Sequence, residues 1–361
     1  MPLDLNKLAS APRILIHAQL KPVAGTRIQP TGFPDLGAAL YDDPNGVPTL
    51  LVESAQSMAN RLEAVCWDEA GDDIASELKG LPFVRVNLQE LGEGNATNSL
   101  LEFHRLNSPY IMKGKNAEGA LFEDVLRPLL GLQPTGKAKK PKADRKTKDE
   151  SPPAAGAETQ AGEEAQEFAG VVNLRKLAEV CFRYDPNSLV HGVFLEKIAG
   201  RLRHPRALSA FIEATGVGRA DSGGVKFDRA LPNPKVANVD AKGGFGNVPF
   251  HRTEFTAREI VAYFSVDLAQ LRGYGLPAEA TELLVTLSLW KIRRFLESSM
   301  RLRSACELEL VNGDQSILVR QPATQFALPT TEELSAKLRE LIQRCKTHFA
   351  SPVVTELTWT N

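Results

Sequence analysis

The sequence predicts an α+β fold whose elements follow one another as in a split βαβ unit. Residues 14–23 alternate apolar and polar side chains, which is the pattern of a half-buried strand. Residues 277–300 carry apolar side chains at helical spacing, and residues 303–311 alternate again. Because 43% of the 361 residues are hydrophobic, the chain has enough apolar material for one large domain or two modest ones, and we treat 1–361 as a single domain.

The first quarter of the chain supplies two further strands and a helix. Residues 25–46 are rich in glycine and proline, so no regular structure is expected there. Residues 47–54 predict a short strand. A helix is expected over residues 54–70, because the Ser54 hydroxyl is a suitable N-cap and apolar residues follow at helical spacing. Residues 82–89 alternate and predict another strand.

The middle of the chain changes character. Residues 133–167 join a basic run to a tract of alanine, glycine, proline and glutamate without periodicity, which predicts a disordered insertion. A helix is expected over 173–184. Residues 188–217 are predicted as a strand or short helix, followed by a helical stretch that is broken near Pro205.

The last third predicts a hairpin and two helices. Residues 224–231 look extended, and residues 241–268 run from a glycine-rich tip into an alternating strand, as in a β-hairpin. The helix over 277–300 has Pro277 in its first turn, and residues 330–349 form a final amphipathic helix.

Charge is unevenly distributed along the chain. The formal net charge is −1, but residues 170–303 contain 20 Lys and Arg against 13 Asp and Glu, a local net charge of +7. The four cysteines and six histidines are widely spaced, without a CxxC, HxH or HxxxH pair, so no metal or cofactor is expected and the cysteines are predicted to be buried free thiols. With no apolar run of the roughly 18 residues that span a bilayer, we expect a cytoplasmic protein without a membrane partner.

Sequence motifs of enzymes are missing. GxSxG, Walker A and HExxH do not occur, and the glycine-rich residues 242–247 lead into a strand instead of a helix N-terminus. Asp35, Asp42, Asp43 and Glu53 could hold Mg²⁺ for RNA cleavage, which leaves a metal-dependent ribonuclease as the alternative function. Because Asp42 and Asp43 precede Pro44, Asn45 and Gly46, a purely structural role in a turn is the stronger interpretation.

A second group of residues suits single-stranded nucleic acid. Guanidinium and ammonium groups neutralise phosphates, glycine lets the backbone approach them, and exposed rings stack on bases. Without further information, solvated surface charge with core aromatics explains the same pattern equally well. The group comprises Arg201, Arg203, His204, Arg206, Arg219, Lys226, Lys235, Lys242, Phe245, Phe250, His251 and Arg252.

Four passages resemble a known family. They are RIQPTGFPDLG (27–37), ESAQSMANRLE (53–63), FRYDPNSLVHGVFLE (182–196) and RHPRALSAFIEATGV (203–217). They are similar to the backbone proteins of type I-U (also called I-G) CRISPR Cascade complexes, which belong to the RAMP superfamily. The resemblance implies a modified RNA-recognition-motif palm with a ferredoxin-like fold. It also implies helical fingers, placed here over 90–132 and 168–220, and a protruding β-hairpin thumb, placed over 225–256.

The resemblance also implies a function. Such subunits are not enzymes; they assemble side by side along the guide RNA spacer and present bases for pairing with target DNA. The implied partners are the CRISPR guide RNA, target DNA through the guide, copies of the same chain, and the large and guide-end-binding subunits of Cascade. A related group in type III systems cleaves RNA with an aspartate after the first strand, the place of Asp35 here.

Candidate RNA contacts follow from the resemblance and the basic segments. Asn60 and Arg61 could instead cap or brace the sheet, and His191 is as well suited to a structural hydrogen bond. Phe245 or Val248 is the candidate base wedge at the tip of the thumb. The full set is Arg27, Gln29, Ser57, Asn60, Arg61, His191, Arg201, Arg203, Arg206, Lys226, Lys235, Lys242, Phe245, Val248, Phe250 and Arg252.

Overall fold

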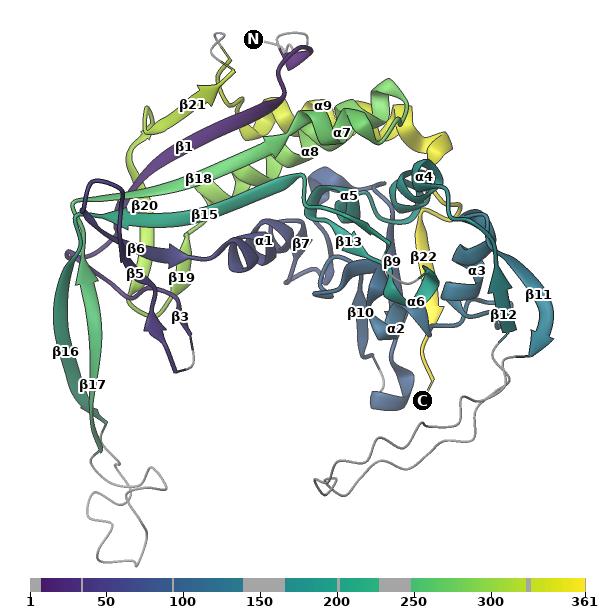
Figure 1. Ribbon diagram of the computed structural model, residues 1–361, viewed down its shortest axis with the longest axis horizontal. Coiled ribbons are helices and arrows are strands. Elements are labelled where there is room, and N and C mark those ends of the chain that lie inside the picture. The colour runs from purple at the N-terminus through teal and green to yellow at the C-terminus, as the bar shows by residue number, and fades with distance from the viewer. Residues whose placement is uncertain are drawn as a thin grey trace, which may run out of the picture.

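The structure is a computed structural model, and it describes residues 8–33, 35–92, 94–138, 166–199, 202–226, 248–322 and 326–360. Figure 1 shows an arched molecule. A curved sheet lies at one side, a lobe of short helices and strands lies at the other, and the helix α1 (Ala55–Ala64) lies between them. None of the described helices is long and apolar enough to cross a membrane.

An eight-stranded antiparallel sheet forms the larger side of the arch. Its order is β19-β20-β1-β18-β15-β6-β5, and β21 also pairs with β1. The strands are β1 (Arg13–Pro22), β5 (Leu40–Asp42), β6 (Pro48–Glu53), β15 (Leu208–Thr215), β18 (Glu259–Asp267), β19 (Arg301–Arg303), β20 (Cys306–Asp314) and β21 (Ile317–Gln321). The mixed α+β class is therefore confirmed.

The central strand β15 corrects a prediction, because residues 208–217 were expected to be helical. Leu208, Ala210, Ile212 and Ala214 are all buried and alternate with partly exposed residues. The two alanines are good helix formers, so propensity favoured a helix. Pairing with β18 on one side and β6 on the other decides for the strand, since tertiary context overrides local preference.

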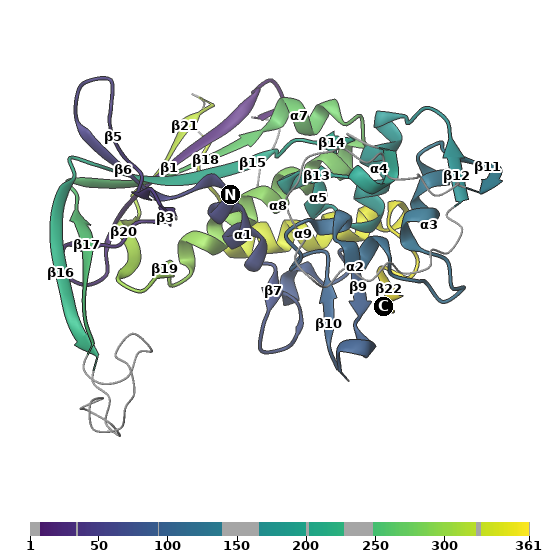
Figure 2. The same ribbon diagram turned by 60° about the horizontal axis from the view of Figure 1, so that its bottom comes forward.

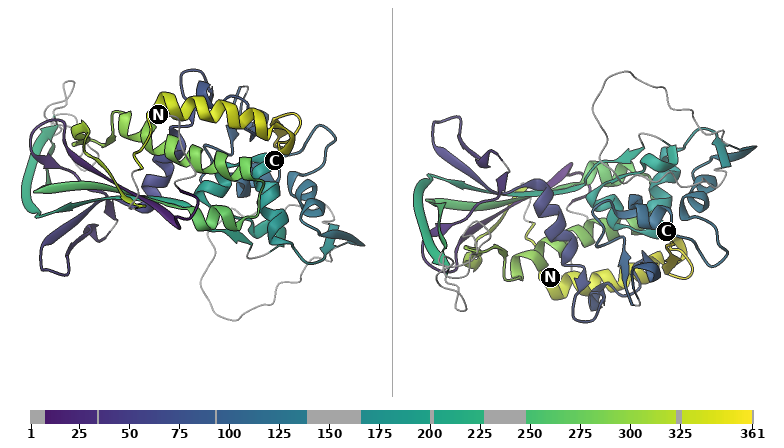
Figure 3. Two further views of the ribbon diagram at one scale, coloured as in Figure 1. Left: turned by 90° about the horizontal axis from the view of Figure 1, so that it is seen from above. Right: turned by 90° about the horizontal axis from the view of Figure 1, so that it is seen from below.

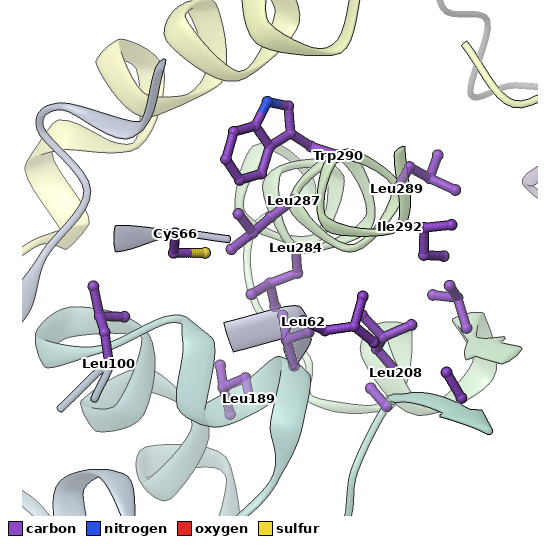
Figure 4. Close-up of a cluster of buried hydrophobic side chains, with 14 of the residues drawn as sticks. Leu62, Cys66, Leu100, Leu189, Leu208, Leu284, Leu287, Leu289, Trp290 and Ile292 are labelled. Atoms are coloured by element: carbon purple, nitrogen blue, oxygen red, sulfur yellow. The ribbon is translucent and has the colours of Figure 1, made fainter. Parts of the chain in front are cut away.

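Three helices cover one face of the sheet. Helix α1 packs on β15, α8 (Ala278–Glu297) packs on β18, and α9 (Thr331–Cys345) runs beside α8, as seen from above in Figure 3. Ser54 caps α1 and a capping box of Thr330 and Glu333 begins α9, so both starts agree with the sequence. Trp290 is fully buried within the leucine-rich cluster of Figure 4 and donates a 3.0 Å hydrogen bond to Ser335 Oγ. All four cysteines are buried and free, as predicted.

The second lobe holds a small sheet of β10 (Ala96–Asn98), β9 (Phe83–Asn87) and β22 (Val354–Thr358), in that order. Around it lie the helices α2 (Pro109–Met112), α3 (Phe122–Leu129), α4 (Leu174–Tyr184), α5 (Asn187–His191) and α6 (Glu196–Ala199). Two short strand pairs also lie in this lobe, β7 (Trp67–Asp68) with β8 (Asp73–Ile74) and β13 (Val193–Phe194) with β14 (Arg203–His204). Helix α7 (Leu268–Gly273) instead follows β18 and contacts β1 and α8.

The ends of the expected disordered insertion correct another prediction. Residues 133–138 form β11 (Gln133–Ala138), which pairs with β12 (Gln166–Ala169), so residues 133–138 and 166–167 have regular structure. Residues 139–165 of that insertion lie outside the described residues.

A long hairpin continues from the ends of the interior strands β15 and β18. It consists of β16 (Gly218–Lys226) and β17 (Val248–Thr256), paired from Gly218↔Thr256 to Lys226↔Val248, and Figures 1 and 2 both show it projecting away from the sheet. Short strand β2 (Arg27–Ile28) pairs with the base of β17. The glycine-rich segment 25–46, expected to lack regular structure, thus contains β2, β5 and the pair β3 (Gly32–Phe33) and β4 (Gly37–Ala38).

Candidate nucleic-acid interface

The segment of residues 25–46, which we call the first loop, meets the hairpin β16–β17 at one buried carboxylate. Glu254 on β17 is 3% exposed, and its two oxygens lie 2.9 Å from Arg27 Nη1 and 2.6 Å from Arg252 Nη2. Ser222 on β16 donates a third hydrogen bond, of 2.8 Å, to Oε2. Because one carboxylate faces two guanidinium groups, Arg27, Arg252 and Glu254 carry a net charge of +1. We call these three residues the hairpin-base cluster.

A cavity of about 410 Å³ lies beside the hairpin-base cluster. Gln29, Gly32, Leu40, Arg219 and Thr253 are among the residues that line it. The Gln29 side-chain oxygen is buried there without a hydrogen-bond partner. Arg219 is held by Asp221 at 3.0 Å and by Thr253 at 3.2 Å, so it is fixed across the two strands. The structure therefore brings Arg27 and Arg252 together at Glu254, although they are far apart in the sequence, whereas Gln29 lines the cavity with Arg219 and Thr253.

The three predicted RNA-contacting residues on helix α1 are of two kinds. Asn60 is exposed and Ser57 is partly exposed, so both are accessible to a ligand. Arg61 points inward, where Nε lies 3.0 Å from Glu53 Oε1 and the terminal nitrogens donate to the carbonyl oxygens of Arg301 and Leu302. For Arg61 the bracing role is the one that these contacts support.

Arg61 belongs to a buried ion cluster. Glu53 is fully buried, and its second oxygen faces Arg303, which also donates to the carbonyl oxygens of Gln29 (3.0 Å) and Val52 (3.1 Å). The cluster of Glu53, Arg61 and Arg303 therefore ties β6, α1 and β19 together and positions the first loop. Glu53 is engaged by two cations, which leaves it unsuited to the Mg²⁺ role considered from the sequence.

Three further predicted contacts lie together at a cavity of about 260 Å³, which we call the His191 pocket. His191, Arg203 and Arg206 line it together with His204, Arg105 and Phe194. Arg105 makes a bidentate pair with Glu63 on α1 (2.5 and 2.7 Å) and donates a 3.0 Å hydrogen bond to the Gly192 carbonyl. Arg206 donates a 2.9 Å hydrogen bond to the Ala55 carbonyl at the start of α1. The expected surface group thus includes a partly buried pocket.

Beneath the pocket lies a group of buried charges. Lys291 on α8 is fully buried and donates a 3.3 Å hydrogen bond to the Leu62 carbonyl. Asp185 is also fully buried and accepts hydrogen bonds from Ser188 Oγ (2.8 Å) and the Asn187 backbone (3.1 Å). Burial raises the pKa of Asp185 to about 6, with the nearby Glu63 acting in the same direction.

This pKa predicts a pH dependence. Between its ordinary pKa and about 6, Asp185 binds a proton more tightly in the folded than in the unfolded chain, so its contribution to stability falls as pH rises through about 6. In Asp185→Asn the side chain stays neutral and keeps an acceptor. We expect the free energy of unfolding of the variant, relative to wild type, to drop by at most about 1.4 kcal/mol per unit as pH falls from 7.5 to 5. Urea denaturation across that range measures it, and a pH-independent difference would contradict it.

Some predicted contacts cannot be placed. Arg201, Lys235, Lys242 and Phe245 lie outside the described residues. Lys226 ends β16 and Val248 begins β17, and Phe250 on β17 is 42% exposed. The RNA contacts of these residues stay predictions.

Among the acidic residues considered for a ribonuclease, Asp43 has contacts that give it a structural role. Asp43 Oδ1 accepts hydrogen bonds from the backbone of Asn45 (2.8 Å) and Val47 (2.9 Å), which hold the turn and lower the pKa of Asp43. Asp35 and Asp42 are exposed. Within the described part of the chain, no three His, Cys, Asp or Glu side chains form a group that could hold a metal ion.

Comparisons with known proteins bear on the identity. The family of CRISPR-associated protein GSU0053 matches residues 14–219, more than half of the chain. The chain belongs to this family. That matched segment contains the first loop, α1, the His191 pocket and β15, and it confirms the resemblance found in the sequence. No curated protein matches the chain. A solved structure, "CRISPR RNA-guided surveillance complex, pre-nicking", is 13% identical over 92% of this chain and 89% of the other, with a TM-score of 0.37, too weak a likeness to support conclusions.

The sequence did not indicate several residues that build these sites. Arg105, Glu63, Lys291 and Arg303 have partners 42 to 251 positions away, as the Arg105–Glu63 (|i−j| = 42) and Arg303–Val52 (|i−j| = 251) hydrogen bonds illustrate. No local spacing signals such pairs. The only hint of a buried partner in the sequence is an arginine or lysine inside an otherwise apolar helical or turn segment. Lys291 inside the apolar helix α8 is the clearest example.

Proposed function

We propose that this chain is the RNA-binding backbone subunit of a Cascade interference complex. In this role it oligomerises along the guide RNA and presents bases to target DNA. It is not an enzyme; its other partners are copies of itself and the large and guide-end-binding subunits. The meeting of the first loop and the hairpin at Glu254 carries the proposal, because it unites two separately predicted RNA-contacting segments in one cationic surface.

The order of elements supports a modified RNA-recognition-motif palm. In chain order, β1, α1, β15, β18, α8 and β20 follow the β-α-β-β-α-β pattern of ferredoxin-like folds. The strands lie side by side as β20-β1-β18-β15, with both helices on one face. The projecting hairpin β16–β17 is in the position of a thumb, and its exposed Phe250 and Arg252 suit contact with a neighbouring copy or its RNA.

The experiment is to purify the protein with guides of increasing length. We expect RNA to co-purify, the oligomer mass to rise with guide length, and affinity to fall as salt rises, because phosphate binding releases counterions. Mass photometry and absorbance ratios read the first two results, and fluorescence anisotropy reads the third.

Two controls separate the alternatives. Assembly that survives nuclease treatment unchanged would indicate a protein-only scaffold and contradict the proposal. Mg²⁺-dependent cleavage of a labelled RNA that disappears in Asp35→Ala or Asp42→Ala would favour the ribonuclease instead.

A further inference from the structure

The His191 pocket contains polar atoms that the protein itself leaves unpaired. Both ring nitrogens of His191, Nε2 of His204 and Nε of Arg206 are buried without a hydrogen-bond partner. Apart from Glu53 Oε2, which faces Arg303, they make up four of the seven such side-chain atoms in the part of the chain that the structure describes. Unpaired buried polar groups are unfavourable, so their concentration around one cavity indicates a site that a ligand completes.

The hydrogen-bonding character of His191 narrows the chemistry of that ligand. His191 is 2% exposed, and burial together with the charges of Lys291, Arg105 and Arg206 holds its pKa well below the usual value. A neutral imidazole has one donor and one acceptor nitrogen. Because the two nitrogens point in different directions, one ligand atom can pair with one of them, and a hydroxyl can either accept from the N–H or donate to the unprotonated nitrogen.

The mouth of the pocket is cationic. Arg105 is already engaged by Glu63 and the Gly192 carbonyl, but Arg206 keeps Nε unpaired and Arg203 is exposed. Phe194, which pairs with Arg203 across the two strands β13 and β14, is 42% exposed beside it. An anion next to an apolar ring therefore fits the entrance.

Backbone geometry holds these groups together. Gly192 has a φ of +85°, and a Cβ atom there would lie 3.0 Å from both the backbone nitrogen of Arg206 and the backbone carbonyl oxygen of His204. Any other residue would push the segment with His204 and Arg206 away from His191. The close approach that makes the pocket thus depends on this glycine.

We infer that the His191 pocket binds one ribonucleotide of the RNA, with Arg203 and Arg206 on its phosphate and His191 on its 2′-hydroxyl. The 2′-hydroxyl is the group that distinguishes RNA from DNA, and it can donate a hydrogen bond to the unprotonated ring nitrogen of His191. This inference rests on the proposed function and adds to it a residue that selects RNA over DNA.

The first experiment uses the wild-type chain with three oligonucleotides of one sequence: RNA, 2′-fluoro RNA and DNA. Fluorine keeps the RNA-like sugar conformation but cannot donate a hydrogen bond. We expect RNA to bind about tenfold more tightly than 2′-fluoro RNA, because one buried hydrogen bond is left unmade. Equal affinity for RNA and 2′-fluoro RNA would overturn the inference and leave the proposed function intact. Binding to none of the three would overturn both.

The second experiment assigns the preference to His191. We expect His191→Leu to bind RNA and 2′-fluoro RNA equally, and His191→Gln, which keeps a donor and an acceptor, to retain part of the preference. His348→Leu is the matched control, since His348 lies after α9 beside Glu279 and should keep the full preference. A preference that survives in His191→Leu would overturn the inference. If His191→Leu does not fold, His191→Gln decides. A reduced or lost preference with RNA binding retained supports the role of His191, and a preference equal to that of wild type overturns the inference.

Discussion

Glu53→Gln is expected to lower the free energy of unfolding by about 3–5 kcal/mol, the range for breaking a buried ion pair. Glu53 is fully buried and faces Arg61 and Arg303, whose side chains are 29% and 23% exposed. The substitution removes the one negative charge between two cations and leaves both of them in a poorly solvated site. Since the cluster joins β6, α1 and β19, the loss should reach the first loop as well.

Chemical denaturation of the RNA-free protein measures this effect. Glu309→Gln is the matched control, because Glu309 pairs with Lys21 on the surface and both side chains are 49% exposed, so a change within about 0.5 kcal/mol is expected. A Glu53 variant no less stable than the Glu309 variant would show that the two arginines do not depend on the carboxylate. Replacing all three cluster residues by methionine should restore part of the stability, because no unpaired charge then remains.

The double substitution Arg27→Gln and Arg252→Gln is expected to weaken RNA binding about 100-fold at low salt. Each charge-assisted contact contributes about 1.5 kcal/mol, or about tenfold in affinity. The slope of log affinity against log salt should also become shallower by about 1.4, since each phosphate contact on a single strand accounts for about 0.7. Anisotropy titrations at several salt concentrations measure both quantities.

The effect of leaving the Glu254 carboxylate unpaired must be separated from the effect of losing the arginine contacts to RNA. Without its two arginines, Glu254 would be an unpaired buried charge that repels RNA and destabilises the hairpin base. Adding Glu254→Gln to the double variant removes that charge. If the triple variant regains wild-type affinity, the arginines do not contact phosphate. Arg339→Gln with Arg344→Gln on α9 changes the net charge equally and should leave binding nearly unchanged.

Elements with a strong local signal could be predicted from the sequence. Strand β1 and helices α8 and α9 follow their periodicity, and Ser54 begins α1 as expected. Strand β15 could not, because alternating alanines satisfy both a helix and a strand until β6 and β18 select the strand. Helix α1 also ends earlier than expected, at Ala64, after which Trp67 pairs in β7.

The sequence predicted residues of the candidate interface but not how they are arranged in space. Sequence placed Arg27 and Arg252 in the set from separate segments, but the carboxylate that joins them was found only through the pairing of β2 with β17. It also placed Arg61 on the RNA side, whereas Glu53 draws that side chain inward. Whether an arginine faces a ligand or a buried partner depends on contacts distant in the chain, which periodicity does not report.

The pairing of β11 with β12 gives an engineering opportunity. Ala138 and Gln166 are partners in this ladder, so these two residues lie side by side. Loop-closure entropy increases slowly with length, by about 0.6 kcal/mol for each doubling. A fluorescent protein or an affinity tag whose own termini are close together can therefore be placed between these two residues, which would allow copies of the protein to be counted by single-molecule microscopy without altering either end of the chain.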